Sequence, residues 1–550
     1  MKVSISIDLK YALFLVAVMS FLLWDLGTYG LAETSEARYA EIAREMYLSK
    51  DYINPTLLGI FHFHKPPITY YITALGYHLF GINEFGARFF MQLAVVIQLI
   101  MVYLLTNLLL KNKKLSFTAG LIYFSMPLVL ISSRNLTTDA YLTTFILAAL
   151  TSWQFYTNKG KILFLYLFYI LVGVALLTKG PVALLFIVIY IVVFKFLMKS
   201  GFRITLHHCI GFILCFALGA SWYFLVAYQN PKLWDYFVHK QVLSRINADA
   251  FNRSKPFWYY LPIVFGLLLP WLVGLLPSLR RKLKRPFKHP KELQVLWISV
   301  LLLLAMFSAF TTKLIMYILP AFWMLAILIA FTLSTASLKT RKVIEFTYFF
   351  QLLTLMIGVF FCWYLEYDFI NITQIDVFLN FCATCIVFAI FYLLKNKTSL
   401  RTPVLATCFS LVLLTTANGA LNHNNDLINA MRDEVSFIEA KSSGKKPKII
   451  VYDYLLSSIP FYSGTYQVTL KDSHNTTDRE IQFQNGLEWK KTLLDVHNQD
   501  NLDDLKILAN QQNTFLLIRK KRGLSEDLSF LKKSFNSKKT TAKWIILYHS

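Results

Sequence analysis

A short polar segment near the start of the chain holds side chains that could do chemistry. The segment ETSEARYAEIAREM (residues 33–46) follows directly after an apolar run. Within two helical turns it offers two carboxylates, a guanidinium and a phenol, from Glu33, Glu36, Arg38 and Tyr39. Carboxylates can act as acids or bases, and arginine binds phosphate through paired N–H donors. Charged groups at the edge of a membrane are costly, so we treat them as candidates for function.

A second segment, HFHKPP (residues 62–67), adds two histidines and a lysine. Lys65 offers a cation to a developing negative charge, such as that of a departing phosphate. His62 and His64 lie two residues apart and point the same way on an extended segment, so they could share a divalent metal. They could equally lie at the level of the lipid headgroups. Beyond this possible metal, the sequence identifies no cofactor.

Further charged residues are expected at the outer ends of apolar runs. Cations outnumber carboxylates among them, which suits a site where an acid or base acts beside a bound phosphate. These residues are Arg88, Arg134, Asp139, Lys179, Arg245, Arg253 and Lys313. Each also has a structural interpretation. Asp139 could cap a helix, Lys179 and Lys313 could be interface anchors, and Glu36 and Arg38 could form the solvated face of a helix.

The composition indicates that a membrane protein positions these groups. The 550 residues are 56% hydrophobic and 16% charged, whereas soluble domains are about a quarter charged. A net charge of +24 would suggest nucleic acid as the partner of a soluble chain. Here much of the excess lies in short connections between apolar runs, where membrane orientation and anionic headgroups account for it. We therefore expect membrane lipids and no nucleic acid as partners. The six cysteines lie in apolar runs and are predicted to be structural.

About thirteen apolar runs approach the length of about 20 residues that a membrane-spanning helix needs. They lie near residues 11–29, 89–110, 115–132, 140–156, 162–178, 181–198, 207–227, 257–276, 294–311, 315–333, 344–365, 377–394 and 403–418. Basic residues gather in every second connection, for example KNKK (111–114) and LRRKLKRPFKHPK (279–291). This alternation predicts that the N-terminus lies in the cytoplasm and the C-terminus outside, with a retained first span.

The chain divides into two predicted domains. Residues 1–420 form an all-α transmembrane domain, whose first outer loop (30–88) contains two short amphipathic helices in the membrane interface. Their tyrosines and charged faces are expected to lie toward the headgroups. Residues 421–550 alternate β-forming stretches with polar ones, in KPKIIVYDYLL, NTFLLIRKK and AKWIILYH, and predict a small soluble α/β domain.

Several motifs, in their order along the chain, resemble a known family. They are ETSEARYAEIAREM, FHKPPITYY, NEFGARFF, TTDAYLTTF, LLTKGP, PFWYYLPIVFGLLLPW and KLIMYILPAF. Together they are similar to the bacterial polytopic glycosyltransferases whose best-known member transfers 4-amino-4-deoxy-L-arabinose to lipid A. These enzymes are relatives of the protein O-mannosyltransferases and have the GT-C fold. The resemblance covers roughly residues 10–330. Beyond that only the layout matches, with further spans and then an outside domain.

The resemblance implies a sugar donor on polyprenyl phosphate, such as undecaprenyl phosphate, and transfer at the periplasmic face of the bacterial inner membrane. The implied acceptor is lipid A or another envelope glycoconjugate. In this family an aspartate is expected where this chain has Ser35, and a glutamate where it has His64. A hydroxyl acceptor needs a carboxylate to take its proton, whereas a phosphate acceptor needs no strong base.

The candidate residues receive the following roles. Glu36, Asp139 and Lys65 are the predicted catalytic groups. The predicted cations for the donor phosphate are Lys65, Lys179, Arg245, Arg253 and Lys313. The predicted substrate-binding residues are Glu33, Arg38, Tyr39, Arg88 and Tyr317. A single displacement with these groups inverts the anomeric centre. The alternatives are transfer to a protein or polysaccharide and, in a different class, a lipid or glycan transporter or flippase.

Overall fold

The computed structural model describes residues 7–33, 35–201, 203–244, 253–283, 290–367, 370–442 and 444–549. It divides into two compact units. We call the first, Met1–Leu26 with Phe89–Ala420, the membrane unit, and the second, Gly27–Arg88 with Leu421–Ser550, the loop–sheet unit. The sequence grouped residues 30–88 with the transmembrane helices. In the structure this loop packs with the C-terminal residues instead.

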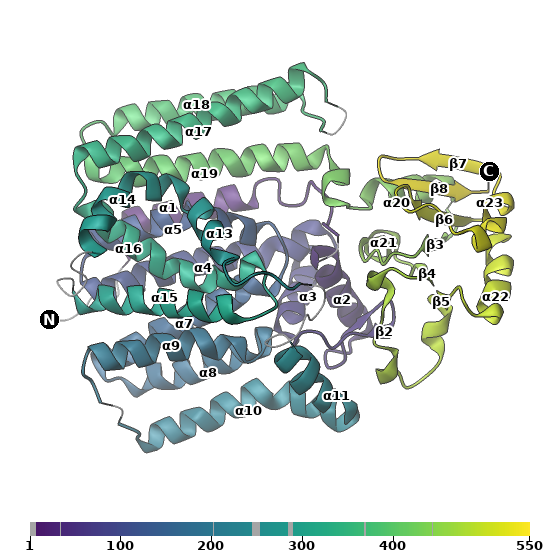
Figure 1. Cartoon of the computed structure of the whole chain (residues 1–550), viewed down its shortest axis with the longest axis horizontal. Coiled ribbons are helices and arrows are strands. Elements are labelled where there is room, and N and C mark those ends of the chain that lie inside the picture. Colours follow the sequence, from purple (N-terminus) through teal and green to yellow (C-terminus); the bar gives the residue numbers. More distant parts are fainter. Residues whose placement is uncertain are drawn as a thin grey trace. The chain divides into compact units, whose positions relative to one another are not determined.

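The membrane unit is built from apolar helices. They are α1 (Leu9–Leu23), α4 (Glu84–Leu110), α5 (Lys113–Phe124), α6 (Pro127–Ser133), α7 (Thr138–Lys159), α8 (Ile162–Lys179), α9 (Val182–Leu197), α10 (Leu206–Gln229), α11 (Lys232–Asp235), η1 (Tyr236–Leu243), α13 (Tyr260–Leu267), α14 (Leu269–Leu283), α15 (Lys291–Ala309), η4 (Ile315–Ala321), α16 (Phe322–Ser334), α17 (Leu338–Tyr364), α18 (Gln374–Leu393) and α19 (Thr398–Asn422). The first turn of α4 belongs to the loop–sheet unit. Neighbouring helices such as α7, α8 and α10 lie side by side (Figure 1).

Each of the thirteen predicted apolar runs overlaps one or more of these helices. Among the described residues, eight helices are long and apolar enough to cross a membrane, or nine when α5 and α6 count as one span. The run 115–132 is bent by 64° between α5 and α6, because Pro127 cannot continue the first helix and starts the second. The chain is therefore a multi-pass membrane protein. Residues 284–289 of the basic connection 279–291 lie outside the described residues.

The first loop forms the predicted pair of helices, α2 (Ser35–Ser49) and α3 (Ile68–Phe80), with the hairpin β1 (Thr56–Leu57) and β2 (Ile60–Phe61) between them. The expectation that α2 turns its charged face to headgroups is wrong. Its buried residues include Glu36, Glu41, Arg44 and Glu45. These charges have close partners: Arg44 donates to Glu41 at 2.6 and 2.7 Å, and Glu45 accepts backbone N–H groups of the hairpin turn.

The C-terminal residues form the predicted α/β fold around a six-stranded mixed sheet in the order β5-β4-β3-β6-β8-β7. The strands are β3 (Lys448–Tyr452), β4 (Val468–Lys471), β5 (Leu493–Asp495), β6 (Thr514–Arg519), β7 (Ser537–Thr540) and β8 (Trp544–Tyr548). The helices include α20 (Arg432–Lys441), α21 (Ser458–Ser463), α22 (Gln499–Ala509) and α23 (Phe530–Ser534). The three stretches predicted as β-forming are the adjacent strands β3, β6 and β8 (Figure 1).

Candidate active site

A buried ion pair joins the ends of two neighbouring helices in the membrane unit. Asp139 lies in the first turn of α7 and Lys179 is the last residue of α8. The Lys179 ammonium donates to Asp139 Oδ1, and the two side chains are only 7% and 9% exposed. A carboxylate at a helix N-terminus and a cation at a helix C-terminus both complement the helix dipole. The sequence placed these residues 40 positions apart, and the contact between α7 and α8 brings them together.

Tyr317 completes this cluster from a third segment. It lies in η4, which packs against α7, and the Lys179 ammonium is 4.5 Å from the centre of its ring. A cation over an aromatic face is stabilised by the ring quadrupole. The structure therefore brings together the predicted catalytic residue Asp139, the predicted phosphate-binding residue Lys179 and the predicted substrate-binding residue Tyr317. This cluster can hold an acidic or phosphate-bearing group through the lysine and accept a proton at the aspartate.

Lys313 is occupied by backbone carbonyls. It is 2% exposed, and its ammonium donates to Lys255 O at 2.8 Å and to Phe310 O. Its own backbone N–H donates to Arg253 O at 3.1 Å. These bonds tie the segment before α13 to the one before η4, so a phosphate could reach Lys313 only in competition with them. Arg245 lies outside the described residues.

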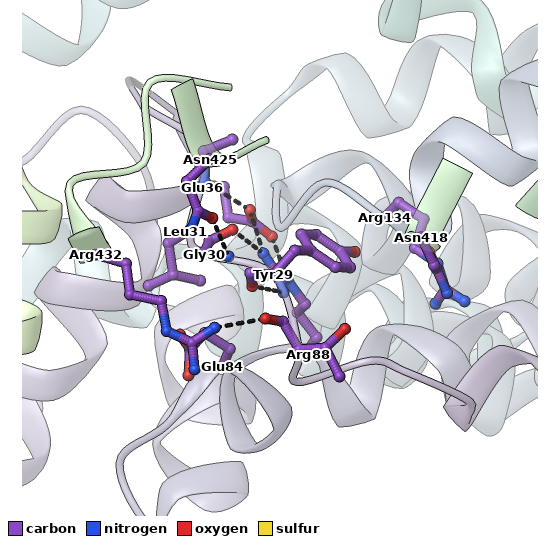
Figure 2. A network of polar contacts seen from close by, with 12 residues as sticks. Tyr29, Gly30, Leu31, Glu36, Glu84, Arg88, Arg134, Asn418, Asn425 and Arg432 are labelled. Carbon is purple, nitrogen blue, oxygen red and sulfur yellow. Dashed lines mark hydrogen bonds and ion pairs between the residues drawn. The ribbon is translucent and has the colours of Figure 1, made fainter. Parts of the chain in front are cut away.

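In the loop–sheet unit, Glu36 forms a buried ion pair with Arg88 (Figure 2). Both side chains are fully buried, and Arg88 donates from Nε and Nη2 to the two carboxylate oxygens, at 2.8 Å each. Arg88 also donates to Tyr29 O and Gly30 O and lies 3.9 Å from the centre of the Tyr29 ring. Glu36 accepts a further bond from the Ala32 N–H at 2.9 Å. The interpretation of Glu36 as part of a solvated face is wrong, and the pair fixes the start of α2.

A second group of charges surrounds the HKPP turn. The rings of His62 and His64 stack with centroids 4.0 Å apart, and His64 Nε2 lies 3.1 Å from Glu480 Oε1. Burial lowers the pKa of His62 well below its usual value, and the positive charges of Arg38 and Lys65 lower it further. The pKa of His64 is also lowered, with burial outweighing the opposing effect of Glu480. Both pKa shifts favour the neutral form of these histidines, which lie among the charges of Arg38, Lys65, Arg479 and Glu480.

Arg479 and Glu480 are members of this group that the sequence did not reveal. Arg479 donates to Leu57 O at 2.6 Å, and burial lowers its pKa to about 10. Its charge also acts on His62. Both residues follow β4 in the C-terminal part of the chain, more than 400 positions from the HKPP turn, and no local pattern marks them. The cluster of Arg38, Lys65 and Arg479 can balance the charge of a phosphate.

Glu33 and Tyr39 lie in the same unit. Burial raises the pKa of Glu33 to about 7, although its Oε1 accepts the Ser458 N–H at 2.6 Å. A carboxyl group that titrates near pH 7 is suited to taking a proton at neutral pH. The Tyr39 ring lies 5.7 Å from that of Tyr70 at the start of α3.

Glu36 and Asp139 belong to different compact units, so their shared role stays a prediction.

The possible metal site receives no cluster of ligands. Across the described ranges, no group of three or more His, Cys, Asp and Glu side chains is placed to hold a metal ion. His64 has a carboxylate partner, and the charges of Arg38, Arg479 and Lys65 act on His62. The divalent metal stays a prediction, and no chemical step below depends on it.

Comparison with known proteins gives consistent matches. Residues 64–224 match the family model of dolichyl-phosphate-mannose-protein mannosyltransferases. The chain is 30% identical over 335 residues to an undecaprenyl phosphate-alpha-4-amino-4-deoxy-L-arabinose arabinosyl transferase of Pseudomonas fluorescens, covering 60% of this chain and 61% of the relative. It is 34% identical to one from Aeromonas salmonicida over 327 residues, 58% of this chain and 59% of the relative. The chain thus matches about three fifths of the length of these curated relatives.

The fold has a match over nearly the full length. The crystal structure of ArnT from Cupriavidus metallidurans bound to undecaprenyl phosphate superposes with a TM-score of 0.76 at 20% identity, covering 98% of each chain. The apo structure gives a TM-score of 0.73. The fold is therefore that of the ArnT structures. The resemblance expected from the order of the motifs is confirmed.

Proposed function

We propose that this chain is an integral membrane glycosyltransferase that moves a sugar from a polyprenyl phosphate, such as undecaprenyl phosphate, to an acceptor at the periplasmic face of the inner membrane. The acceptor proposed first is lipid A. The observation that carries the proposal is the cationic cluster of Arg38, Lys65 and Arg479, because a polyprenyl phosphate leaving group develops negative charge as the glycosidic bond breaks. The names of the relatives and the ArnT fold point to the same donor.

The proposed reaction is a single inverting displacement. The acceptor oxygen attacks the anomeric carbon while the bond to the phosphate oxygen breaks, and the electron pair of that bond leaves with the polyprenyl phosphate. Lys65 and Arg38 stabilise the departing phosphate, with Arg479 adding charge from the C-terminal domain. This assignment gives the predicted cation Lys65 its role and adds Arg479.

A hydroxyl acceptor must also lose a proton. Asp139 and Glu33 are the proposed acceptors of that proton, since Glu33 titrates near pH 7 and Asp139 has its other carboxylate oxygen outside the bond to Lys179. Glu36 uses both oxygens on Arg88 and would take part only after releasing it. Tyr317 is proposed to orient the sugar beside the Lys179 ammonium.

The proposed topology places the C-terminal domain, residues 421–550, in the periplasm and the basic connections in the cytoplasm. About thirteen spans are part of this proposal, since an odd number of spans is needed to place the two termini on opposite sides of the membrane. The transporter alternative predicts charges along the membrane midplane, whereas Asp139 and Lys179 lie at helix ends.

Transfer can be tested with the purified full-length protein. The protein in detergent is mixed with a radiolabelled undecaprenyl phosphate sugar and purified lipid A, and the products are resolved by chromatography and mass spectrometry. We expect labelled lipid A and free undecaprenyl phosphate. If the label moves to protein or polysaccharide in envelope extracts, that molecule replaces lipid A as the proposed acceptor. An absence of transfer to any of these acceptors would overturn the enzymatic proposal.

A matched pair of variants links this activity to the cationic cluster. Lys65→Ala removes a charge from the cluster. Lys50→Ala removes an exposed lysine beyond α2, whose ammonium lies 4.1 Å from the centre of the Tyr47 ring. We expect transfer to be lost in the first variant and retained in the second. Equal activity of both would remove the cluster from the donor site.

A further inference from the structure

The order in which the chain adds strands to the C-terminal sheet reverses between the neighbouring strands β3 and β6. Strands β5, β4, β3 and β6 run parallel, and chain order proceeds from β3 outward to β4 and β5 before it returns to β6 on the other side of β3. In open α/β sheets, ligands bind beyond the carboxyl ends of the strands at such a switch point. The carboxyl ends of β3 and β6 therefore form the candidate ligand-binding position of this sheet.

The two faces of this sheet are covered by different helices. Ile450, Leu516 and Ile518 pack in a core with residues of α22 and α23. Ile449, Val451 and Leu517 pack on the opposite face with residues of α20 and α21. The strands are thus buried on both sides, so their carboxyl ends are the part of this switch point that a ligand can approach.

Four consecutive cations begin at the last residue of β6. The segment RKKR (residues 519–522) turns back at the end of the strand, with the N–H groups of Arg522 and Gly523 donating to Arg519 O at 3.0 Å each. Lys520, Lys521 and Arg522 are exposed. Within the part of the chain that the structure describes, Arg519, Lys520 and Lys521 form no salt bridge, while Arg522 pairs with Asp453. Adjacent like charges repel, so this arrangement favours a bound anion.

Residues after β3 and β4 hold Arg522 in place. Asp453, which directly follows β3, is fully buried at a φ of 46° and accepts the N–H groups of Asp472, Ser473 and His474 at 2.9 to 3.2 Å. Its carboxylate also receives Arg522, which donates to Ser473 Oγ at 2.6 Å.

Two aromatic rings pack beside Arg519 at the same edge of the sheet. The Arg519 guanidinium lies 4.8 Å from the centre of the Tyr454 ring, and that ring lies 4.9 Å from the ring of His474. Burial is the largest cause that lowers the pKa of His474; the charge of Asp453 raises it, and the charges of Arg522 and Arg519 lower it. Burial also lowers the pKa of Lys543 most, with Asp426 opposing the shift and Arg519 and Lys521 adding to it. Arg519 at the end of β6, Lys521 and Arg522 in the turn after it, and Lys543 directly before β8 are thus the cations near this edge.

We propose that the carboxyl ends of β3 and β6 form a phosphate-binding site, in which Arg519, Lys521 and Arg522 hold the phosphoryl group of a ligand. Arginine forks and lysine point charges are both suited to phosphate oxygens. The phosphoryl group comes from a membrane lipid headgroup or from a soluble phosphate compound. This site is separate from the HKPP cluster, and the proposal does not depend on the glycosyltransferase activity.

The full-length protein in phosphatidylcholine nanodiscs provides the test by isothermal titration calorimetry. One arm titrates inorganic pyrophosphate as the soluble probe, and the other titrates dihexanoyl phosphatidic acid, with dihexanoyl phosphatidylcholine as its neutral control. The Lys65→Ala background weakens phosphate binding at the HKPP cluster. We expect binding of pyrophosphate or phosphatidic acid in this background, weakened at least about tenfold by the double substitution Arg519→Gln with Lys521→Gln.

Control variants keep the result interpretable. Lys532→Gln with Lys533→Gln removes two exposed lysines of α23 and should leave binding unchanged. The conservative pair Arg519→Lys with Lys521→Arg should retain binding and shows that the turn tolerates substitution. Pyrophosphate binding alone identifies a soluble ligand, and phosphatidic acid binding alone identifies a headgroup. Failure of both probes to bind, or undiminished binding after loss of Arg519 and Lys521, would overturn the site.

Discussion

The buried ion pair between Glu36 and Arg88 allows a structural role to be separated from a catalytic one. Glu36→Gln keeps the size of the side chain but removes the charge that compensates Arg88. Both side chains are fully buried, and the carboxylate receives two Arg88 bonds at 2.8 Å and the Ala32 N–H at 2.9 Å. Breaking a buried pair by removing one partner costs about 3 to 5 kcal/mol. Since the amide keeps one acceptor oxygen, we expect a loss near the lower end, about 3 kcal/mol.

Hydrogen exchange of the full-length protein in detergent measures this loss where it occurs. A cost of about 3 kcal/mol raises the open population of the start of α2 by about 150-fold, and the amides of residues 35–40 should lose protection by that factor. Lys50→Ala is the control, because Lys50 is exposed beyond the other end of α2 and its ammonium lies 4.1 Å from the centre of the Tyr47 ring. Its effect on protection should stay below about 1 kcal/mol.

The double variant Glu36→Leu with Arg88→Met then tests function. Apolar replacement of a buried pair is often neutral for stability, so protection of α2 should return. If the pair only positions the loop, transfer should return with it, whereas a catalytic Glu36 or a substrate-binding Arg88 leaves transfer absent in a stable protein. Unchanged protection in Glu36→Gln would refute the reasoning, because a buried guanidinium cannot lose its carboxylate at no cost.

Three further predictions concern the other charged groups. Lys65→Ala should lower the transfer rate about a hundredfold and leave thermal unfolding unchanged, as measured by turnover and by melting in detergent; a lowered melting temperature would indicate a structural lysine instead. Asp139→Asn should lower the melting temperature because Lys179 loses its buried partner, and Asp139→Asn combined with Lys179→Met should recover it; additive losses would contradict a direct pair. The pKa of Glu33 rises from 4.5 to about 7 on folding, so the folded state holds this proton more tightly than the unfolded state does. The stability that this provides is complete below pH 4.5 and is lost as the pH rises through about 7. Glu33→Gln should remove that slope from melting curves recorded between pH 4.5 and 7.5, and an unaltered slope would show that another group titrates.

Local sequence patterns determined much of the architecture. Each apolar run became a helix, because burying backbone hydrogen bonds in lipid leaves helices as the form that satisfies them within one segment. The helices over 35–49 and 68–80 followed from apolar residues at helical spacing, and β-branched and aromatic residues marked β3, β6 and β8. Pro127 was visible in the sequence, but the 64° bend at that point depends on how the two half-helices pack.

Tertiary structure alone decided which charges meet. Periodicity showed that Glu36 lies on a helix, but its burial follows from Arg88, 52 positions later. His64 finds Glu480 across 416 positions, and Asp139 finds Lys179 because α7 and α8 pack together. The free energy of such a pair depends on the distance between its two charges and on the cost of removing water from them. Neither quantity is encoded in the residues that neighbour each charge along the sequence. The sequence by itself determined which charged groups the chain carries and which elements hold them, while the packing of distant segments decided which are paired within the fold and which can meet a phosphate.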